Sequence, residues 1–106
     1  MSQLTIEWQN EDGGAQIAIV NESQGVIIGR HPACDIVLPY RYVSRRHAVI
    51  YYAADTFHLQ NLSDTNPTLY NDRWSLDTSP QVELRPGDTF TVGRTRLRIC
   101  PLEGSD

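Results

Sequence analysis

Short runs of alternating apolar and polar residues cover most of the chain. Leu4, Ile6 and Trp8 alternate with polar residues, and this spacing predicts a half-buried strand. Ile17 and Ile19 alternate in the same way and predict a second strand. The sequence has no 3.6-residue apolar repeat of useful length, which an amphipathic helix would need. The pattern therefore predicts a chain built from strands.

Turn residues separate the apolar runs at close intervals along the whole chain. Gly, Pro, Asn and Asp favour tight turns, and they fall between the runs. Phe57, Leu59 and Leu62 are expected to share one inward face, and residues 71–80 are expected to form a loop. Further strands are predicted at 26–28, 36–38, 48–52, 69–70, 82–84, 90–92 and 97–99. About ten short strands with frequent turns are typical of an all-β sandwich or barrel.

The length and composition fit one ordinary domain. The chain has 106 residues, of which 40% are hydrophobic, and this is enough to bury a single core. We expect one domain over residues 1–106 that ends in a polar tail at 101–106.

The cysteines and the apolar runs bear on the cellular compartment. Two cysteines, Cys34 and Cys100, are too few for a disulfide framework and suit a reducing compartment. The chain begins without the pattern of a signal peptide and has no apolar run long enough to span a bilayer. A cytoplasmic location is expected.

The charge distribution points to a local anion site. The net charge is −4, which argues against general binding to nucleic acids or anionic membranes. All nine basic residues are arginines, and the chain has no lysine. Seventeen consecutive residues contain four of them: Arg30, Arg41, Arg45 and Arg46. An acidic protein with a local arginine cluster suggests a discrete anion site rather than a basic face.

A cationic loop precedes the most apolar predicted strand. Ser44 supplies a hydroxyl beside the guanidinium groups of Arg45 and Arg46, and residues 48–52 follow as the strand. Binding groups that a rigid sheet holds on a loop are a common way to build a recognition site. The natural ligand for a hydroxyl with two guanidiniums is an oxyanion, above all phosphate. A solvated basic loop remains the alternative when this stretch is taken alone.

Four sequence pieces, taken together, match a known family. They are Gly29-Arg30, Ser44-Arg45-Arg46-His47, Thr65-Asn66-Pro67-Thr68 with Asn71, and Arg85-Pro86-Gly87-Asp88 followed by Phe90, Val92 and Gly93. In this order and at these spacings the chain resembles a forkhead-associated (FHA) domain over about residues 20–100. The resemblance implies a sandwich of two mostly antiparallel sheets with ten or eleven short strands. It also implies loops at one end that bind phosphothreonine in an extended segment of a partner.

The resemblance assigns roles to individual residues. Arg30 would hold the phosphate, and Ser44 would donate its hydroxyl to a phosphate oxygen. Arg45 would contact phosphate or peptide, and Thr65 would add a contact to the phosphate site. Asn66 would bind the peptide backbone. Four residues would support the loops that carry this site: Gly29, His47, Thr68 and Asn71.

Two substitutions distinguish this chain from the family pattern near the proposed site. Pro67 replaces a glycine, and its ring fixes φ and removes a backbone donor. Asp64 replaces a common serine, and its carboxylate can accept the Asn66 N–H while adding negative charge. The four intact residues favour phosphate binding: Arg30, Ser44, Thr65 and Asn66. Affinity and peptide preference are the properties that these substitutions leave open.

Catalytic and metal-binding alternatives find little support in the sequence. Ser44 and His47 lie together, but no nucleophile-elbow motif surrounds the serine, so a buried, hydrogen-bonded histidine is expected. His31 and Cys34 have a spacing that metal sites use, but no second pair follows. We therefore expect a binding module that is not an enzyme and needs no metal or cofactor.

The expected partner is a phosphothreonine-containing protein, either a substrate of a Ser/Thr kinase or such a kinase itself. Neither nucleic acid nor a membrane is expected as a partner. The alternative is a phospho-independent interaction or assembly module on the same fold. The sequence leaves open the oligomeric state, the partner, the upstream kinase and any further domains.

Overall fold

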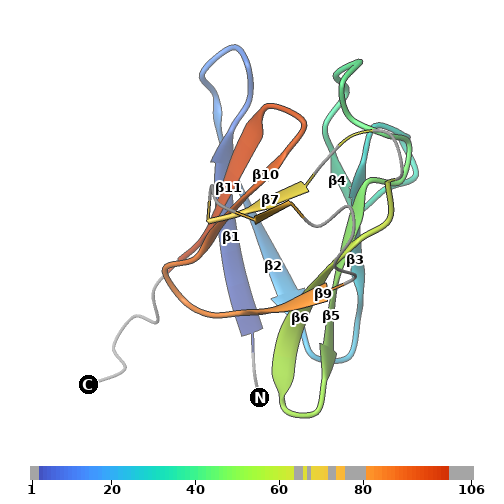
Figure 1. The fold of residues 1–106 in the computed structure, drawn as a ribbon. Helices are drawn as coiled ribbons and strands as arrows, with labels where there is room; N and C mark the ends of the chain where they lie inside the picture. The colour runs from blue at the N-terminus through green and yellow to red at the C-terminus, as the bar shows by residue number, and fades with distance from the viewer. Residues whose placement is uncertain (1–2, 64–65, 67, 72–73, 76–80, 101–106) are drawn as a thin grey trace.

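Eleven strands pack as two facing sheets in this computed structural model, which describes residues 3–63, 66, 68–71, 74–75 and 81–100 (Figure 1). The prediction of an all-β sandwich is confirmed. The described chain contains no helix that is long and apolar enough to cross a membrane. The strands are β1 (Gln3–Gln9), β2 (Ala15–Asn21), β3 (Val26–Gly29), β4 (Ile36–Val37), β5 (Ala48–Ala53), β6 (Thr56–Asn61), β7 (Thr68–Tyr70), β8 (Trp74–Ser75), β9 (Gln81–Leu84), β10 (Thr89–Val92) and β11 (Thr95–Ile99).

Strand pairing is antiparallel almost throughout. One sheet has the order β2-β1-β11-β10-β7-β8, and the other has the order β4-β3-β5-β6-β9. The short contact between β3 and β4 is parallel, and the other pairings between described strands are antiparallel. This arrangement confirms the expected mostly antiparallel sandwich.

The core lies between the two sheets and follows the two-residue repeat of the strands. Ile6 and Phe90 come from one sheet, Ile28 and Ile50 come from the other, and all four are fully buried. Successive side chains of a strand point to opposite faces, so alternate residues of each strand enter this layer.

Strand β2 is present as predicted, but its isoleucines point outward. Ile17 is 66% exposed and Ile19 is 55% exposed, whereas Val20 is fully buried. The pairing with β1 places Val20 opposite the buried Leu4. Because cross-strand partners share a face, Val20 takes the inward position and the two isoleucines take the outward one.

Two local predictions were wrong. Leu62 was expected to face inward, but it is 43% exposed, because β6 ends at Asn61 and the chain then turns toward His47. Residues 71–80 were expected to form a loop, but Trp74–Ser75 forms β8 against β7. The chain reverses near Asn71, whose φ of 52° is a turn conformation.

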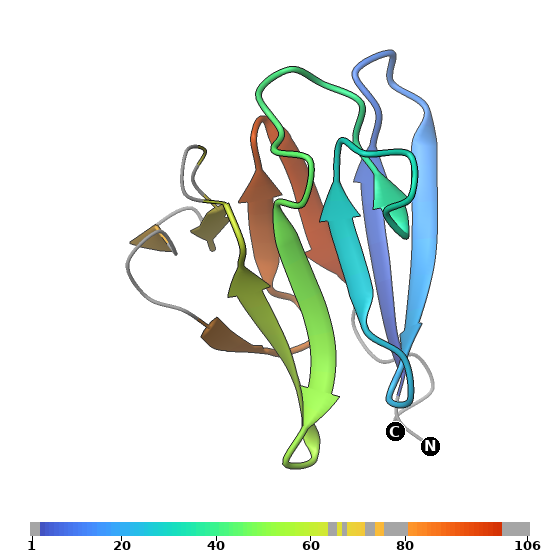
Figure 2. The same ribbon diagram turned by 90° about the vertical axis from the view of Figure 1, so that its right-hand side faces the viewer.

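Several connections gather at one end of the sandwich. The β1–β2, β3–β4, β4–β5 and β10–β11 connections lie at the end opposite the chain's first described residues (Figure 2). The β3–β4 and β4–β5 connections lie side by side there, and backbone hydrogen bonds join them. This end carries the cationic loop identified in the sequence.

Candidate functional site

A close backbone approach at Gly29 sets the geometry of the site. A Cβ at this position would lie 2.1 Å from the carbonyl oxygen of Arg45 and 2.8 Å from its carbonyl carbon. Only glycine avoids that collision, so glycine allows the end of β3 to lie against the loop that precedes β5. The Arg30 N–H then donates to the Ser44 carbonyl at 3.0 Å, and Arg30 and Ser44 become neighbours.

The Arg30 guanidinium is anchored at one end and exposed at the other. Its Nε donates to the carbonyl oxygen of the buried Val43 at 3.0 Å. A guanidinium has five N–H donors, and this bond uses one of them. The two terminal amino groups make no hydrogen bond to another described residue, and four donors are available to a ligand.

Hydroxyl and amide groups form a network beside Arg30. The Ser44 and Ser63 hydroxyl oxygens are 2.6 Å apart, and either hydroxyl can be the donor. The Asn66 side-chain amide donates to Ser44 Oγ at 3.1 Å, and the Asn66 backbone N–H donates to Ser63 Oγ at 2.9 Å. The network therefore joins the β4–β5 and β6–β7 connections.

His47 is fully buried and joins three segments of the chain at the base of the site. Its Nδ1 accepts the Ser44 N–H at 3.1 Å, so the ring proton is on Nε2 when the ring is neutral. The backbone N–H of His47 donates to the Ile28 carbonyl, and the backbone carbonyl of His47 accepts the N–H groups of Leu62 and Ser63. These bonds position β3, the Ser44 loop and the segment after β6 relative to one another.

Thr68 fixes the segment that carries Ser63 and Asn66. It is fully buried, and its hydroxyl donates to Asn61 Oδ1 at 2.9 Å. The Asn61 amide in turn donates to the Ser63 carbonyl at 2.7 Å. Thr68 therefore acts on the site through Asn61.

Asn71 supports the sheet away from the candidate site. Its Oδ1 accepts the Thr89 N–H at 2.8 Å, and its own N–H donates to the Thr89 carbonyl at the same distance. These bonds hold the turn after β7 against β10.

Two side chains near these elements have raised pKa values. Burial raises the pKa of the Cys34 thiol, which donates to the Arg45 carbonyl at 3.1 Å. Burial and the neighbouring Asp88 carboxylate raise the pKa of Tyr70 to about 12. The Tyr70 hydroxyl donates to Asp88 Oδ2 at 2.6 Å, and ionisation would break this bond.

A hollow of about 320 Å³ is lined by several of the residues predicted for the site. Its lining contains four exposed arginines, and no Asp or Glu among the described residues contributes to it. The guanidiniums bear like charges, so an anion is the natural ligand. The described lining residues are Arg30, Arg41, Val43, Ser44, Arg45, Arg46, Leu62, Ser63 and Asn66.

Four of the residues predicted for the site line this hollow together, and Ser63, which was not among the predicted residues, lines it as well. The structure brings together Arg30, Ser44, Arg45 and Asn66, while Gly29, His47 and Thr68 lie in the supporting layer. The missed signal is a serine three residues before Asn66, because a hydroxyl at that spacing can accept the asparagine N–H. Three residues of the predicted site region lie outside the described part of the chain: Asp64, Thr65 and Pro67.

Comparisons of the sequence with known proteins give a consistent result. The family model described as FHA domain matches residues 26–93. FhaB of Mycobacterium tuberculosis, an FHA domain-containing protein, is 32% identical over 88 residues, which are 83% of this chain and 54% of FhaB. FhaB of Mycolicibacterium smegmatis matches with the same identity and coverage. The chain spans about half the length of these curated relatives.

Solved structures of similar fold include FHA domains. The FhaA FHA domain, in complex with the intracellular domain of another protein, has a TM-score of 0.76 and 27% identity, covering 91% of this chain and 98% of that one. A structure from a study of phosphothreonine-dependent FHA domain interactions has a TM-score of 0.75 and 27% identity, and the match covers 95% of this chain and 100% of that one. The FHA domain of CT664 from Chlamydia trachomatis shares the fold, with a TM-score of 0.81 and 19% identity over 95% and 99% of the two chains.

Proposed function

The chain belongs to the FHA family, and we propose that it is a phosphothreonine-dependent protein–protein interaction module without catalytic activity. Its ligand is an extended segment of a partner whose phosphothreonine occupies the arginine-lined hollow. The observation that carries this proposal is the anchored Arg30 guanidinium beside the network of Ser44, Ser63 and Asn66. The related FHA structure studied for phosphothreonine-dependent interactions supports it.

The donors at the hollow suit the chemistry of a phosphate group. A phosphorylated threonine carries about 1.5–2 negative charges at neutral pH and three strong acceptor oxygens. Arg30 supplies terminal N–H groups that lie beyond its Nε anchor. When Ser63 is the donor in the bond between the two hydroxyls, Ser44 Oγ accepts from Ser63 and Asn66 and can direct its own proton to a phosphate oxygen. Phosphate binding is then compatible with the hydrogen bonds that join these three residues.

Three further residues are proposed to contact the phosphate or the peptide on either side of it. Arg45 is exposed on the rim, where it can contact phosphate or peptide. Asn66 is proposed to bind the peptide backbone, and Thr65 is proposed to add a phosphate contact. The partner is a substrate of a Ser/Thr kinase or such a kinase itself.

The expected affinity is moderate. Each charge-assisted hydrogen bond contributes about 1.5–3 kcal/mol net. Three such bonds total about 4.5–9 kcal/mol before the cost of ordering the peptide is subtracted, so a Kd of about 1 μM, which corresponds to about −8 kcal/mol, is the tight end of the expected range. This affinity suits a reversible contact that a kinase and a phosphatase control.

Fluorescence anisotropy with degenerate peptide pools tests the proposal. Pools with a central phosphothreonine, phosphoserine or unmodified threonine are titrated with the folded domain. We expect the phosphothreonine pool to bind at least about tenfold more tightly than the unmodified pool, from the loss of one or more charge-assisted bonds. Arg30→Ala should abolish this preference. Arg85→Ala is the matched control, since Arg85 is exposed and pairs with Glu83 away from the hollow.

Two results would contradict the proposal. The first is equal binding of the three pools. The second is a partner that retains its affinity after phosphatase treatment, which would favour the phospho-independent alternative.

A further inference from the structure

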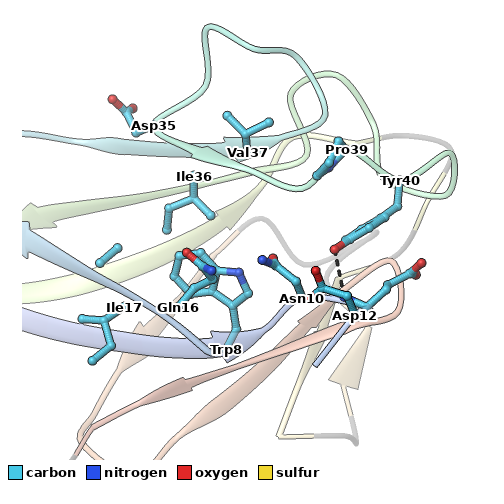
Figure 3. Close-up of a pocket in the computed structure, with 12 residues that line it drawn as sticks. Trp8, Asn10, Asp12, Gln16, Ile17, Asp35, Ile36, Val37, Pro39 and Tyr40 are labelled. Atoms are coloured by element: carbon cyan, nitrogen blue, oxygen red, sulfur yellow. Dashed lines mark hydrogen bonds between the residues drawn. The ribbon is translucent and has the colours of Figure 1, made fainter. Parts of the chain in front are cut away.

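A groove of about 690 Å³ lies between the free edges of the two sheets (Figure 3). Strand β2 and the turn before it form one side, and β4 with the residues after it forms the other. Six of the lining residues give it an apolar surface: Trp8, Ile17, Ile36, Val37, Pro39 and Tyr40. The groove is separate from the arginine-lined hollow, because the two share no lining residue.

Strand β2 lacks the usual protection of an edge strand. It is seven residues long, contains neither proline nor a charged residue, and pairs only with β1 among the described strands. Edge strands usually carry charges, prolines or bulges that prevent another strand from adding to them. In contrast, β4 at the neighbouring edge is two residues long and Pro39 follows soon after it. The free edge of β2 is therefore the better acceptor for an added strand.

The exposed apolar side chains of the described chain concentrate beside this groove. Ile17 and Val37 line it, and they are 66% and 38% exposed. Ile19, which is 55% exposed, follows Ile17 on the same face of β2. The fourth large exposed apolar residue, Leu62, lines the arginine-rich hollow instead. A strand added to β2 would bring side chains against both isoleucines.

Carboxylates around β2 favour a positively charged ligand at this edge and groove. Glu11 and Asp12 precede the strand, Glu22 follows it, and Asp35 lines the groove from the opposite side. The Glu11 carboxylate makes no ion pair with a described residue. A second copy that added antiparallel at β2 would bring its Glu22 near the Glu11–Asp12 end, where like charges repel. A basic segment would meet attraction at the same positions.

We propose that β2 and this groove bind an extended basic segment of a partner protein as an added β-strand. Main-chain hydrogen bonds to the free edge of β2 hold the segment, apolar side chains cover Ile17 and Ile19, and Lys or Arg side chains face the carboxylates. Docking at this groove does not depend on phosphate binding.

A hydrogen bond connects this groove to the loop of the phosphate site. The Glu11 N–H donates to the Tyr40 hydroxyl at 3.0 Å and joins the β1–β2 turn to the β4–β5 connection (Figure 3). The same connection carries Arg41 and Ser44 of the hollow. The groove and the arginine-lined hollow are therefore linked through the β4–β5 connection.

A selection from random peptides tests the proposal. Unphosphorylated dodecapeptides displayed on phage are selected on the domain, and the enriched sequences are synthesised with a fluorescent label. We expect alternating β-branched or aromatic residues with an excess of Lys and Arg. In anisotropy titrations the Ile17→Thr/Ile19→Thr variant should bind these peptides about tenfold more weakly, since it removes apolar contact while threonine keeps the strand propensity.

Charge variants and the phosphate site provide the controls. Glu11→Gln should weaken binding about threefold, and Glu83→Gln, whose carboxylate lies away from the groove, should not change it. Arg30→Ala should leave the selected peptides bound while it removes phosphopeptide binding. The Ile17→Thr/Ile19→Thr variant should show the opposite pattern, so the failure of one site is distinguishable from the failure of the other.

Four outcomes would overturn the proposal. Three come from the peptide experiments: the absence of any enriched peptide, selected peptides without net positive charge, and an affinity that the Ile17→Thr/Ile19→Thr variant does not alter. Sedimentation that shows a wild-type dimer, and a monomer for this variant, would assign the edge to a second copy of the chain and would also overturn it.

Discussion

The substitution Gly29→Ala tests how the sandwich builds its phosphate site. The methyl group would lie 2.1 Å from the Arg45 carbonyl oxygen and 3.0 Å from Cys34 Sγ. Gly29 has no positive φ, so the effect comes from this contact rather than from backbone strain. A backbone carbonyl cannot rotate away as a side chain can, and β3 must separate from the Ser44–Arg45 loop.

The expected magnitude follows from the kind of contact. Overpacking typically costs about 1–3 kcal/mol, and a clash with backbone belongs at the upper end of this range. At about 4 °C per kcal/mol, a loss of about 3 kcal/mol lowers the Tm by about 12 °C. Separation of Arg30 from Ser44 removes at least one charge-assisted bond to phosphate, so phosphopeptide affinity should fall at least about tenfold.

The assay pairs calorimetric unfolding with phosphopeptide titration, and Gly25→Ala is the matched control. A Cβ at Gly25 would lie 3.6 Å from the Ile50 carbonyl oxygen, which is an ordinary contact, and Gly25 also lacks a positive φ. Gly25→Ala should change the free energy of unfolding by less than about 0.5 kcal/mol. Equal Tm values and equal affinities for the two variants would refute the role of the close approach at Gly29.

Three further predictions concern Ser63, Thr68 and Tyr70. Ser63→Ala should weaken phosphopeptide binding about fivefold in anisotropy titrations, because the two hydrogen bonds through which its hydroxyl orients Ser44 and Asn66 are lost. Thr68→Val should lower the free energy of unfolding in urea by about 0.5–1.5 kcal/mol, because the hydrogen bond from the Thr68 hydroxyl to the half-buried Asn61 Oδ1 is lost. The raised pKa of Tyr70, about 12 against an ordinary 10.0, predicts that stability falls as the pH rises from 10 to 12. The unfolded chain loses this proton first, so Tyr70→Phe should flatten the decline in urea denaturation.

The controls for these predictions lie outside the hydrogen-bond network of the site. Ser23→Ala changes an exposed turn serine and should leave phosphopeptide affinity unchanged. Thr91→Val lies on β10, outside the network, and should cost less than Thr68→Val. Ser63→Ala with full affinity, Thr68→Val as stable as Thr91→Val, or a Tyr70→Phe variant with the wild-type pH dependence would each contradict the corresponding prediction.

The repeat of apolar residues predicted the strands better than it predicted their faces. Alternation identified β1 and β2, and it showed which residues share a face within each strand. It could not show that Ala18 and Val20 face inward while Ile17 and Ile19 face solvent, because both sets alternate. The pairing of β2 with β1 decides this, and pairing is a long-range property.

The site prediction was incomplete because the site is formed by contacts between residues that are far apart in the sequence. Arg30, Ser44 and Asn66 lie far apart in the sequence, and the resemblance to a family predicted that they meet. Ser63 was missed because its role depends on the 2.6 Å contact with Ser44, which the separation of 19 residues does not reveal. Leu62 was assigned to the core by its apolar side chain, although β6 ends one residue before it.

The most direct test of phosphate recognition at Arg30 is a thermodynamic cycle on one selected peptide. The Kd of its phosphothreonine form and of its unmodified form is measured for the wild-type domain and for Arg30→Ala. We predict that the phosphate strengthens wild-type binding at least about tenfold more than it strengthens binding to the variant, since a charge-assisted bond contributes about 1.5–3 kcal/mol. The same phosphate effect in both proteins would contradict the assignment of the phosphate to the hollow beside Arg30.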